Sequence, residues 1–396
     1  GADRLNSALV TAQHVWDALS ESGVKFITNP SNPYEAVSED PSFPVDYTQF
    51  PRDTLKLKSG QCDDLSTLLA SLLESSRVKT ALLDFPGHMA LMFDSESDDP
   101  LEVGLPRGDL VSHGGTLWIP VEATMVGRPF SEAVRKAAYS YRTEDAKGAV
   151  KIIESRQAWL SYEPATLPRT DWAPEVPSAA ARGKRSATEL AGWAKDRSRF
   201  LKAHFEGLLK KDSGDLESLN ELGVLEHESG NKDDARKRFK EALALNGKDA
   251  SAWNNLGTMD FMSGDFAAAE ANYLKASAAD PDDPSVWLNL ARCGLKLKTV
   301  EKAKAYSAKA VALDPGLDFR GQIARGHADD QQQGGPHDHG GNGGPEDFQC
   351  SHIVIPDRAS RARIQPGRMA EPCNEAYPGR GKRSKPVKIV RGCCKV

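Results

Sequence analysis

Between residues 216 and 317 the chain repeats itself with a period of 34 residues. A period of this length is typical of stacked helix pairs, in which each pair buries its apolar face against the next pair. Small residues at recurring positions let the paired helices approach closely. The recurring positions are Leu222, Leu256 and Leu290; Gly223, Gly257 and Ala291; Ala235, Ala269 and Ala303; and Ala242, Ala276 and Ala310.

The second unit of this repeat reads Trp253-Asn254-Asn255-Leu256-Gly257, followed by Ala269, Tyr273, Ala276 and Pro281. This pattern resembles the tetratricopeptide repeat, and three such units fit between residues 216 and 317. The resemblance implies an all-α solenoid whose concave surface binds an extended peptide or protein partner.

The first part of the chain has a different pattern, in which helices precede short apolar strands. This order is typical of the α+β class. Apolar residues at helical spacing predict helices, and short β-branched or apolar runs predict strands. We expect helices over residues 3–23 and 62–76, strands over 79–85, 88–93 and 117–121, and renewed helical structure over 131–159.

Shifts in composition predict four regions. Residues 1–160 form the α+β domain, and residues 161–187, which are rich in proline, form a linker. Residues 188–317 hold a further amphipathic helix and the three repeats. Residues 318–396 are rich in glycine, histidine and proline and then in basic residues, so we expect a disordered tail.

Three residues of the α+β region have the chemistry of a nucleophilic triad. Cys62 opens a predicted helix, where unpaired N–H groups and the helix dipole favour a thiolate. His88 opens a predicted strand and would take the thiol proton and later return it to the leaving group. Glu122 follows another strand and would orient the imidazole.

Several neighbours are candidate supports for this chemistry. Gly60 would allow close approach of an acyl group, and the Cys62 N–H would help to hold an oxyanion. Gln61, Gln49 and Tyr34 are candidates for a second oxyanion donor. We expect the acidic side chains of residues 63 and 64 to complement the helix N-terminus and to point away from the sulfur.

Residues 12–124 as a whole resemble the transglutaminase-like (papain-related) domain. The resemblance is carried by Gly60-Gln61-Cys62-Asp63-Asp64-Leu65, by Gly87-His88 before an apolar strand, and by Trp118-Ile-Pro-Val-Glu122-Ala-Thr124. It implies catalysis through a thioester on cysteine, with hydrolysis or transfer at an amide or acyl bond of a peptide or protein substrate. Glu122 departs from the aspartate that is usual in this family, which puts full activity in doubt.

Each site residue also has a purely structural interpretation. Cys62 could serve as a small buried apolar residue, His88 as a satisfied histidine at a strand start, and Glu122 as a surface carboxylate. The alternative function is therefore a non-catalytic adapter with a degenerate transglutaminase-like domain. His113, within Ser112-His113-Gly114-Gly115, is expected in a loop rather than as a second base.

Composition adds few further constraints. Hydrophobic residues make up 39% of the chain, which suits soluble domains, and no apolar stretch is long enough to span a bilayer. The net charge of −5 is too mild to argue for or against a nucleic-acid partner, but the basic tail lacks interleaved aromatic residues, so nucleic acid is not an expected partner. The proposed chemistry requires no metal or organic cofactor. The chain begins at Gly1 without a cleavable signal, and both a cytoplasmic and an exported location stay open.

Overall fold

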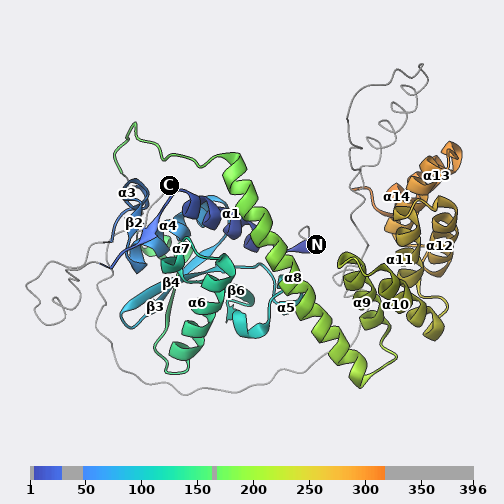
Figure 1. Cartoon of the computed structure of the whole chain (residues 1–396), viewed down its shortest axis with the longest axis horizontal. Helices are drawn as coiled ribbons and strands as arrows, with labels where there is room; N and C mark the ends of the chain where they lie inside the picture. Colours follow the sequence, from blue (N-terminus) through green and yellow to red (C-terminus); the bar gives the residue numbers. More distant parts are fainter. Residues whose placement is uncertain (1–3, 29–47, 163–166, 317–396) are drawn as a thin grey trace, which may run out of the picture. The chain divides into compact units, whose positions relative to one another are not determined.

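The computed structural model describes residues 4–28, 48–162 and 167–316 (Figure 1). Tyr34 and the predicted tail therefore lie outside the described residues. The described chain divides into two compact units, one ending at Leu201 and the other beginning at Lys202. The first unit combines helices with a sheet and the second is helical, as the α+β and solenoid predictions require.

A five-stranded antiparallel sheet in the order β5-β6-β4-β3-β7 organises the first unit. The three predicted strands correspond to the three inner strands of this sheet, β6, β4 and β3. The strands are β3 (Thr80–Phe85), β4 (His88–Asp94), β5 (Val111–His113), β6 (Thr116–Val121) and β7 (Lys151–Glu154).

A two-residue turn joins β3 to β4 and fixes where β4 begins. Phe85 pairs with His88 in the antiparallel register, so only Pro86 and Gly87 connect the strands. Proline presets its own φ, and Gly87 adopts a φ of 70°, which an L side chain rarely tolerates. The turn therefore makes His88 the first residue of its strand.

Each face of the sheet buries its own apolar cluster. Helices α1 (Ser7–Glu21), α4 (Cys62–Ser75) and α6 (Phe130–Asp145) contribute to the first cluster together with Phe93 and Ile119. The second cluster lies on the opposite face, because its residues alternate with those of the first along each strand. It contains Ala81, Leu83, Phe85, Ala90, Met92, Val111 and Trp118.

The sheet curls around this second cluster. Its edge strands β5 and β7 would lie about 19 Å apart in a flat sheet, given the usual strand spacing. Yet His113, the last residue of β5, places Nε2 2.7 Å from Glu154 Oε1 at the end of β7. The ring of His113 also meets the Trp118 ring edge-on, with 5.6 Å between centroids. The expectation of a loop at His113 is thus wrong, because the residue ends a strand and joins the two sheet edges.

Two further differences from the sequence predictions concern the helices around the sheet. The stretch 131–159 is not wholly helical, because Gly148 has a φ of 65° and β7 then pairs with β3 before α7 (Ser155–Ser161) begins. A short helix that was not predicted begins at Pro51. The remaining small elements are α3 (Pro51–Leu57), α5 (Pro100–Val103), η2 (Arg107–Asp109), η3 (Ala123–Met125), and the parallel pair β1 (Lys25–Phe26) and β2 (Ser59–Gly60).

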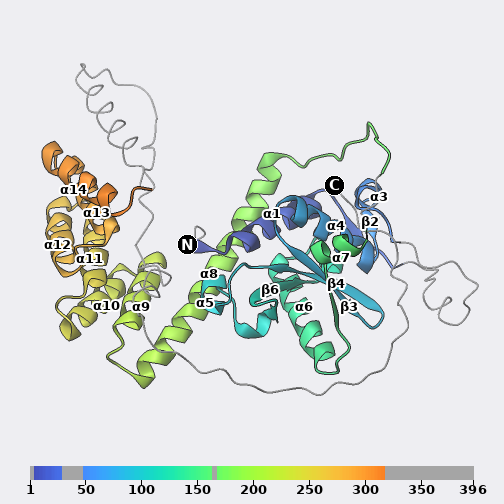
Figure 2. The same cartoon turned by 180° about the vertical axis from the view of Figure 1, so that it is seen from behind.

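The long helix α8 (Ala179–Lys211) begins inside the range 161–187, where a linker was predicted. Its early turns hold a buried polar network with α1, in which Arg185 and Ser186 bind the fully buried carboxylate of Asp17 at 3.0 and 2.7 Å. Trp193 donates its indole N–H to Gln13. These contacts explain why a segment with little apolar periodicity is helical, and α1 and α8 lie side by side in Figures 1 and 2.

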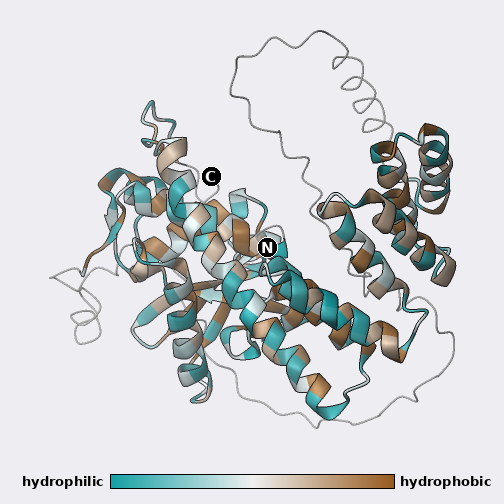
Figure 3. Cartoon of the chain, turned by 45° about the vertical axis from the view of Figure 1, so that its right-hand side comes forward, coloured by the Kyte–Doolittle hydropathy of each residue, from teal (hydrophilic) through white to brown (hydrophobic). Residues whose placement is uncertain are grey.

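The second unit consists of three helix pairs, each with hydrophilic and hydrophobic residues along its helices (Figure 3). A Cβ at Gly223 would lie 2.5 Å from the Phe239 ring, and one at Gly257 would lie 2.6 Å from the Tyr273 ring. The recurring glycines are therefore required by close packing within each pair. The helices are α9 (Leu216–Glu228), α10 (Lys232–Leu245), α11 (Ala250–Met262), α12 (Phe266–Ala279), α13 (Pro284–Lys296) and α14 (Val300–Leu313).

The last turns of α8 take the place of the second helix of a preceding repeat. Lys202 pairs with Glu226, and Arg236 pairs with Asp260 at 2.8 Å, with both partners shifted by 34 residues. Phe205 is buried and precedes the buried Phe239 by the same interval. The solenoid thus begins half a repeat earlier than the sequence pattern indicated.

Gly257→Ala is expected to destabilise the solenoid by about 1–3 kcal/mol, because the added methyl group overlaps the Tyr273 ring. Gly207→Ala in α8 is the matched control: nothing lies within 4 Å of its Cβ position. That change should stabilise by about 0.5–1 kcal/mol. Urea unfolding followed by circular dichroism measures both, and equal effects of the two changes would contradict this packing argument.

Candidate functional site

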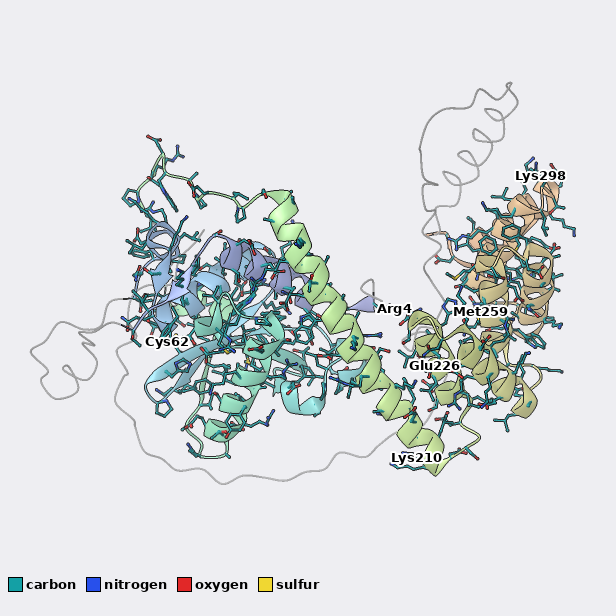
Figure 4. The ribbon with its side chains drawn as sticks, in the orientation of Figure 1. Arg4, Cys62, Lys210, Glu226, Met259 and Lys298 are labelled. Atoms are coloured by element: carbon teal, nitrogen blue, oxygen red, sulfur yellow. The ribbon has the colours of Figure 1, made fainter. Side chains whose placement is uncertain are left out.

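Cys62 is the first residue of α4 and is partly exposed at the start of that helix (Figure 4). The N–H groups of a first helical turn have no partners within the helix, and the helix dipole is positive there. A sulfur in this position is therefore placed where negative charge is favoured.

Packing of α4 against the sheet brings this helix end to the start of β4. The helix buries Leu65, Leu68 and Leu69 in the first cluster. One turn after Cys62, the buried hydroxyl of Ser66 donates to the carbonyl of Met89 at 3.3 Å. Because Met89 follows His88 directly, this bond ties the first turn of α4 to the strand that carries the imidazole.

His88 and Glu122 meet because β4 begins where its antiparallel neighbour β6 ends. His88 Nε2 lies 2.7 Å from Glu122 Oε2. The other oxygen, Oε1, accepts bonds from the Thr124 hydroxyl at 2.6 Å and from the Thr124 N–H at 3.2 Å. Glu122 is only 3% exposed, so it is a buried, fully engaged carboxylate rather than a surface one.

The three side chains influence one another electrostatically. Hydrogen bonds first to Cys62 and then to Glu122 raise the pKa of His88 from its usual 6.5 to about 10, although burial opposes the charge. Burial disfavours ionisation of Glu122, but hydrogen bonds from His88 and Thr124 outweigh it and leave the pKa of Glu122 below its usual range. The structure therefore brings Cys62, His88 and Glu122 together with the imidazole in the centre.

The predicted support residues Gly60, Gln61 and Gln49 all contact the side chain of Asp64, which the sequence did not indicate. The space of a Cβ at Gly60 is taken by Asp64 and Thr54, whose atoms would lie 2.7 and 3.1 Å away, so glycine here serves the packing of the helix start. The backbone N–H of Gln61 donates to Asp64 at 2.9 Å. The side-chain amide of Gln49 donates to the same carboxylate at 2.9 Å.

Two contributors to the site were not assigned from the sequence: Thr124 holds the Glu122 carboxylate, and Ser66 ties α4 to β4. Asp64 accepts the Gln61 N–H at the helix start, as expected of an acidic residue there, but its bond to Gln49 was not predicted. Thr124 had a local signal, because it stands two residues after the carboxylate it holds. Ser66 and Asp64 lie on a helix whose apolar pattern gives no indication of which polar residue turns inward.

In the described part of the chain, no group of three or more histidine, cysteine or acidic side chains is arranged to hold a metal ion. Among the same residues, no helix is long and apolar enough to cross a bilayer. What the cluster can do chemically is to supply a sulfur nucleophile, a proton donor and acceptor, and an orienting carboxylate.

Comparison with known proteins identifies the type of repeat in the second unit. A family model described as tetratricopeptide repeat matches residues 220–259 and 261–318, which confirms the predicted repeats. The match spans helices α9 to α14 and ends at residue 318, and it does not extend to the residues of the thiol cluster. A search of curated proteins found no match.

Solved structures of MamA are similar to part of the chain. One MamA structure is 22% identical to this chain, with a TM-score of 0.30, and the match covers 37% of this chain and 84% of the MamA chain. A second has 21% identity and a TM-score of 0.27, covering 34% of this chain and 70% of its own. A double mutant of MamA RS-1 has 19% identity and a TM-score of 0.28, covering 38% of this chain and 90% of its own.

The raised pKa of His88 gives a pH prediction with a definite sign. Because the folded pKa of about 10 exceeds the usual 6.5, the stabilisation from His88 is complete below about pH 6.5 and is lost as pH rises through about 10. His88→Gln should therefore lower the free energy of unfolding most near pH 6 and least above pH 10.

Histidine-selective NMR measures the same ionisation directly. The His88 ring should stay protonated through neutral pH, and Glu122→Gln should lower its titration midpoint by removing the hydrogen-bonded carboxylate. A midpoint near 6.5 in the unmodified protein would contradict the assembled cluster.

Proposed function

We propose that this chain is a protein-binding adapter, in which the tetratricopeptide module holds an extended segment of a partner protein. The observation that carries this proposal is the match of residues 220–259 and 261–318 to the repeat family. Stacked helix pairs present a continuous concave surface, which suits an extended chain. The limits 1–160, 161–187, 188–317 and 318–396 remain predictions for the functional division of the chain.

The adapter function predicts that peptide binding depends on an intact solenoid. Ala269 is fully buried in α12, so Ala269→Arg places an unpaired charge in the repeat core and should abolish binding. Ala267 lies exposed on the same helix, so Ala267→Arg is the matched control and should bind normally. The measurement is enrichment of a random-sequence peptide library on the immobilised full-length chain.

Two results would count against the adapter function. One is equal enrichment by the Ala269→Arg and Ala267→Arg chains, and the other is no enrichment by the unmodified chain. Circular dichroism of each variant shows whether the repeats of that variant are folded.

A second function is favoured by one specific observation, the hydrogen-bonded cluster of Cys62, His88 and Glu122. We propose that the first unit is a cysteine-nucleophile hydrolase or acyltransferase of the transglutaminase-like kind. The placement of the cysteine on a helix start and of the histidine and carboxylate on neighbouring strands supports that resemblance. Glu122 in place of the usual aspartate still reaches His88 at 2.7 Å.

The proposed reaction uses each group in turn. The Cys62 thiolate attacks the carbonyl carbon of an amide, and the carbonyl electron pair moves onto oxygen. As this intermediate collapses, the carbon–nitrogen bond breaks and the amine leaves with a proton from the His88 imidazolium. Neutral His88 then takes a proton from water, or from an acceptor amine, as that molecule attacks the thioester carbonyl carbon. The carbon–sulfur bond breaks, the acid or the new amide leaves, and the Cys62 thiolate and the His88 imidazolium are restored.

Selective alkylation tests the thiol function. At about pH 6, iodoacetamide should modify Cys62 at least about tenfold faster than the buried Cys293, and His88→Gln should remove most of this advantage. Burial raises the pKa of Cys293 to about 12, so it serves as an internal control. Mass mapping of peptides assigns each alkylation. Slow, equal modification of both residues would leave only the adapter function.

A further inference from the structure

We infer that Asp64 is a positioning residue, which holds the side-chain amide of Gln49 beside Cys62 as an oxyanion donor. This inference rests on the proposed thiol chemistry and names the residues that would stabilise its charged intermediate. Gln49 is the group that would touch the substrate oxygen, and Asp64 acts through it.

The carboxylate of Asp64 links two segments that are distant in sequence. Its Oδ1 accepts the backbone N–H of Gln49 at 2.6 Å. Its Oδ2 accepts the side-chain amide of Gln49 at 2.9 Å and the backbone N–H of Gln61 at 2.9 Å. Gln61 immediately precedes the nucleophile, so one carboxylate fixes both the start of the Cys62 helix and the residue that would serve as donor.

A second bond fixes the same segment. The hydroxyl of Thr48 donates to Asp63 at 2.7 Å. The consecutive residues Thr48 and Gln49 are thus bound to the consecutive residues Asp63 and Asp64 in the first turn of α4. This attachment places Gln49 against the helical turn that carries Cys62.

The hydrogen-bond inventory of the Gln49 amide defines its orientation. The amide nitrogen carries two N–H donors, and Asp64 accepts one of them, which leaves one for a substrate oxygen. A carboxylate cannot accept from the amide oxygen, so Oε1 is turned away from Asp64. That oxygen is buried without a partner among the described residues. A buried unpaired acceptor is retained where another requirement fixes the side chain.

The surroundings of Asp64 are built for this role. Asp64 is 1% exposed, and burial raises its pKa while the bonds from Gln61 and Gln49 oppose that rise. Gly60 provides the room, because a Cβ there would lie 2.7 Å from Asp64 Cβ. The Gly60-Gln61-Cys62-Asp63-Asp64 string therefore supplies a space, a helix start, a nucleophile and two attachments for the donor segment.

Two reactions of the full-length chain separate positioning from thiol activation. Iodoacetamide reacts at a saturated carbon and creates no oxyanion, whereas acetylation of Cys62 by 4-nitrophenyl acetate passes through one. Asp64→Asn should slow acetylation of Cys62 by about tenfold or more. It should leave alkylation of Cys62 within about twofold of the unmodified protein, because the thiolate is untouched. Mass spectrometry of the Cys62 peptide measures both rates.

A double-mutant cycle shows whether Asp64 acts through Gln49. Gln49→Met removes the N–H donors but keeps the side-chain volume and the backbone bond to Asp64. The double variant Gln49→Met/Asp64→Asn should acetylate no more slowly than Gln49→Met alone. Asp98→Asn is the matched control, because it neutralises an exposed carboxylate outside the site, and it should acetylate at the unmodified rate.

The outcomes are distinguishable from failure of the thiol chemistry itself. If the unmodified Cys62 is neither alkylated selectively nor acetylated, the proposed catalytic function fails. If the unmodified Cys62 reacts but Asp64→Asn acetylates equally fast, the positioning role is overturned. Should Asp64→Asn fail to fold, unchanged acetylation by Gln49→Met overturns the inference and a selective loss supports it.

Discussion

The Glu122 carboxylate is almost completely buried, and a buried charge is stable only when its oxygens are hydrogen-bonded. Thr124 satisfies one oxygen and His88 the other. This requirement fixes the imidazole ring, which is also hydrogen-bonded to Cys62. The position of the ring beside Cys62 therefore depends on a carboxylate that is almost fully shielded from solvent. The longer glutamate side chain meets this requirement because its strand ends beside the start of β4.

The central part of this site was predictable because its signals are local. The Pro-Gly pair predicts a turn just before β4, and the leucine spacing after Cys62 predicts the helix that carries the sulfur. The position of Asp64 was not predictable, because its partners lie at Gln49 and Gln61, and no local pattern links a helix residue to a loop 15 positions earlier. The role expected for Gly60 changed for the same reason, since its neighbours include a side chain that folds back from the helix.

Regular structure failed to match expectation where tertiary pairing overrides propensity. Helical propensity around residue 150 gives way to β7, because Ile152 and Ile153 pair with β3 at the sheet edge. The start of α8 has few apolar residues, yet Arg185 and Ser186 bury polar contacts with Asp17 and make a helix there. The repeats were the most predictable part, because each helix packs against neighbours that recur at fixed intervals in the sequence. The glycines beside Phe239 and Tyr273 recur at the same interval, because only glycine leaves room for these rings.

The charge pairs between neighbouring repeats do not continue along the whole solenoid. Lys202 with Glu226 and Arg236 with Asp260 belong to one series, but the next members of that series are Glu270 and Gly294. In this pair the position of the basic residue is occupied by an acidic one, and the position of the acidic residue is occupied by glycine. An additional 34-residue copy could be spliced in ahead of α9 with its charges already complementary. A copy inserted between α12 and α13 would instead place its acidic side chain opposite Glu270, which already pairs with Lys302. The charges therefore favour lengthening the array ahead of α9 over lengthening it at this inner junction.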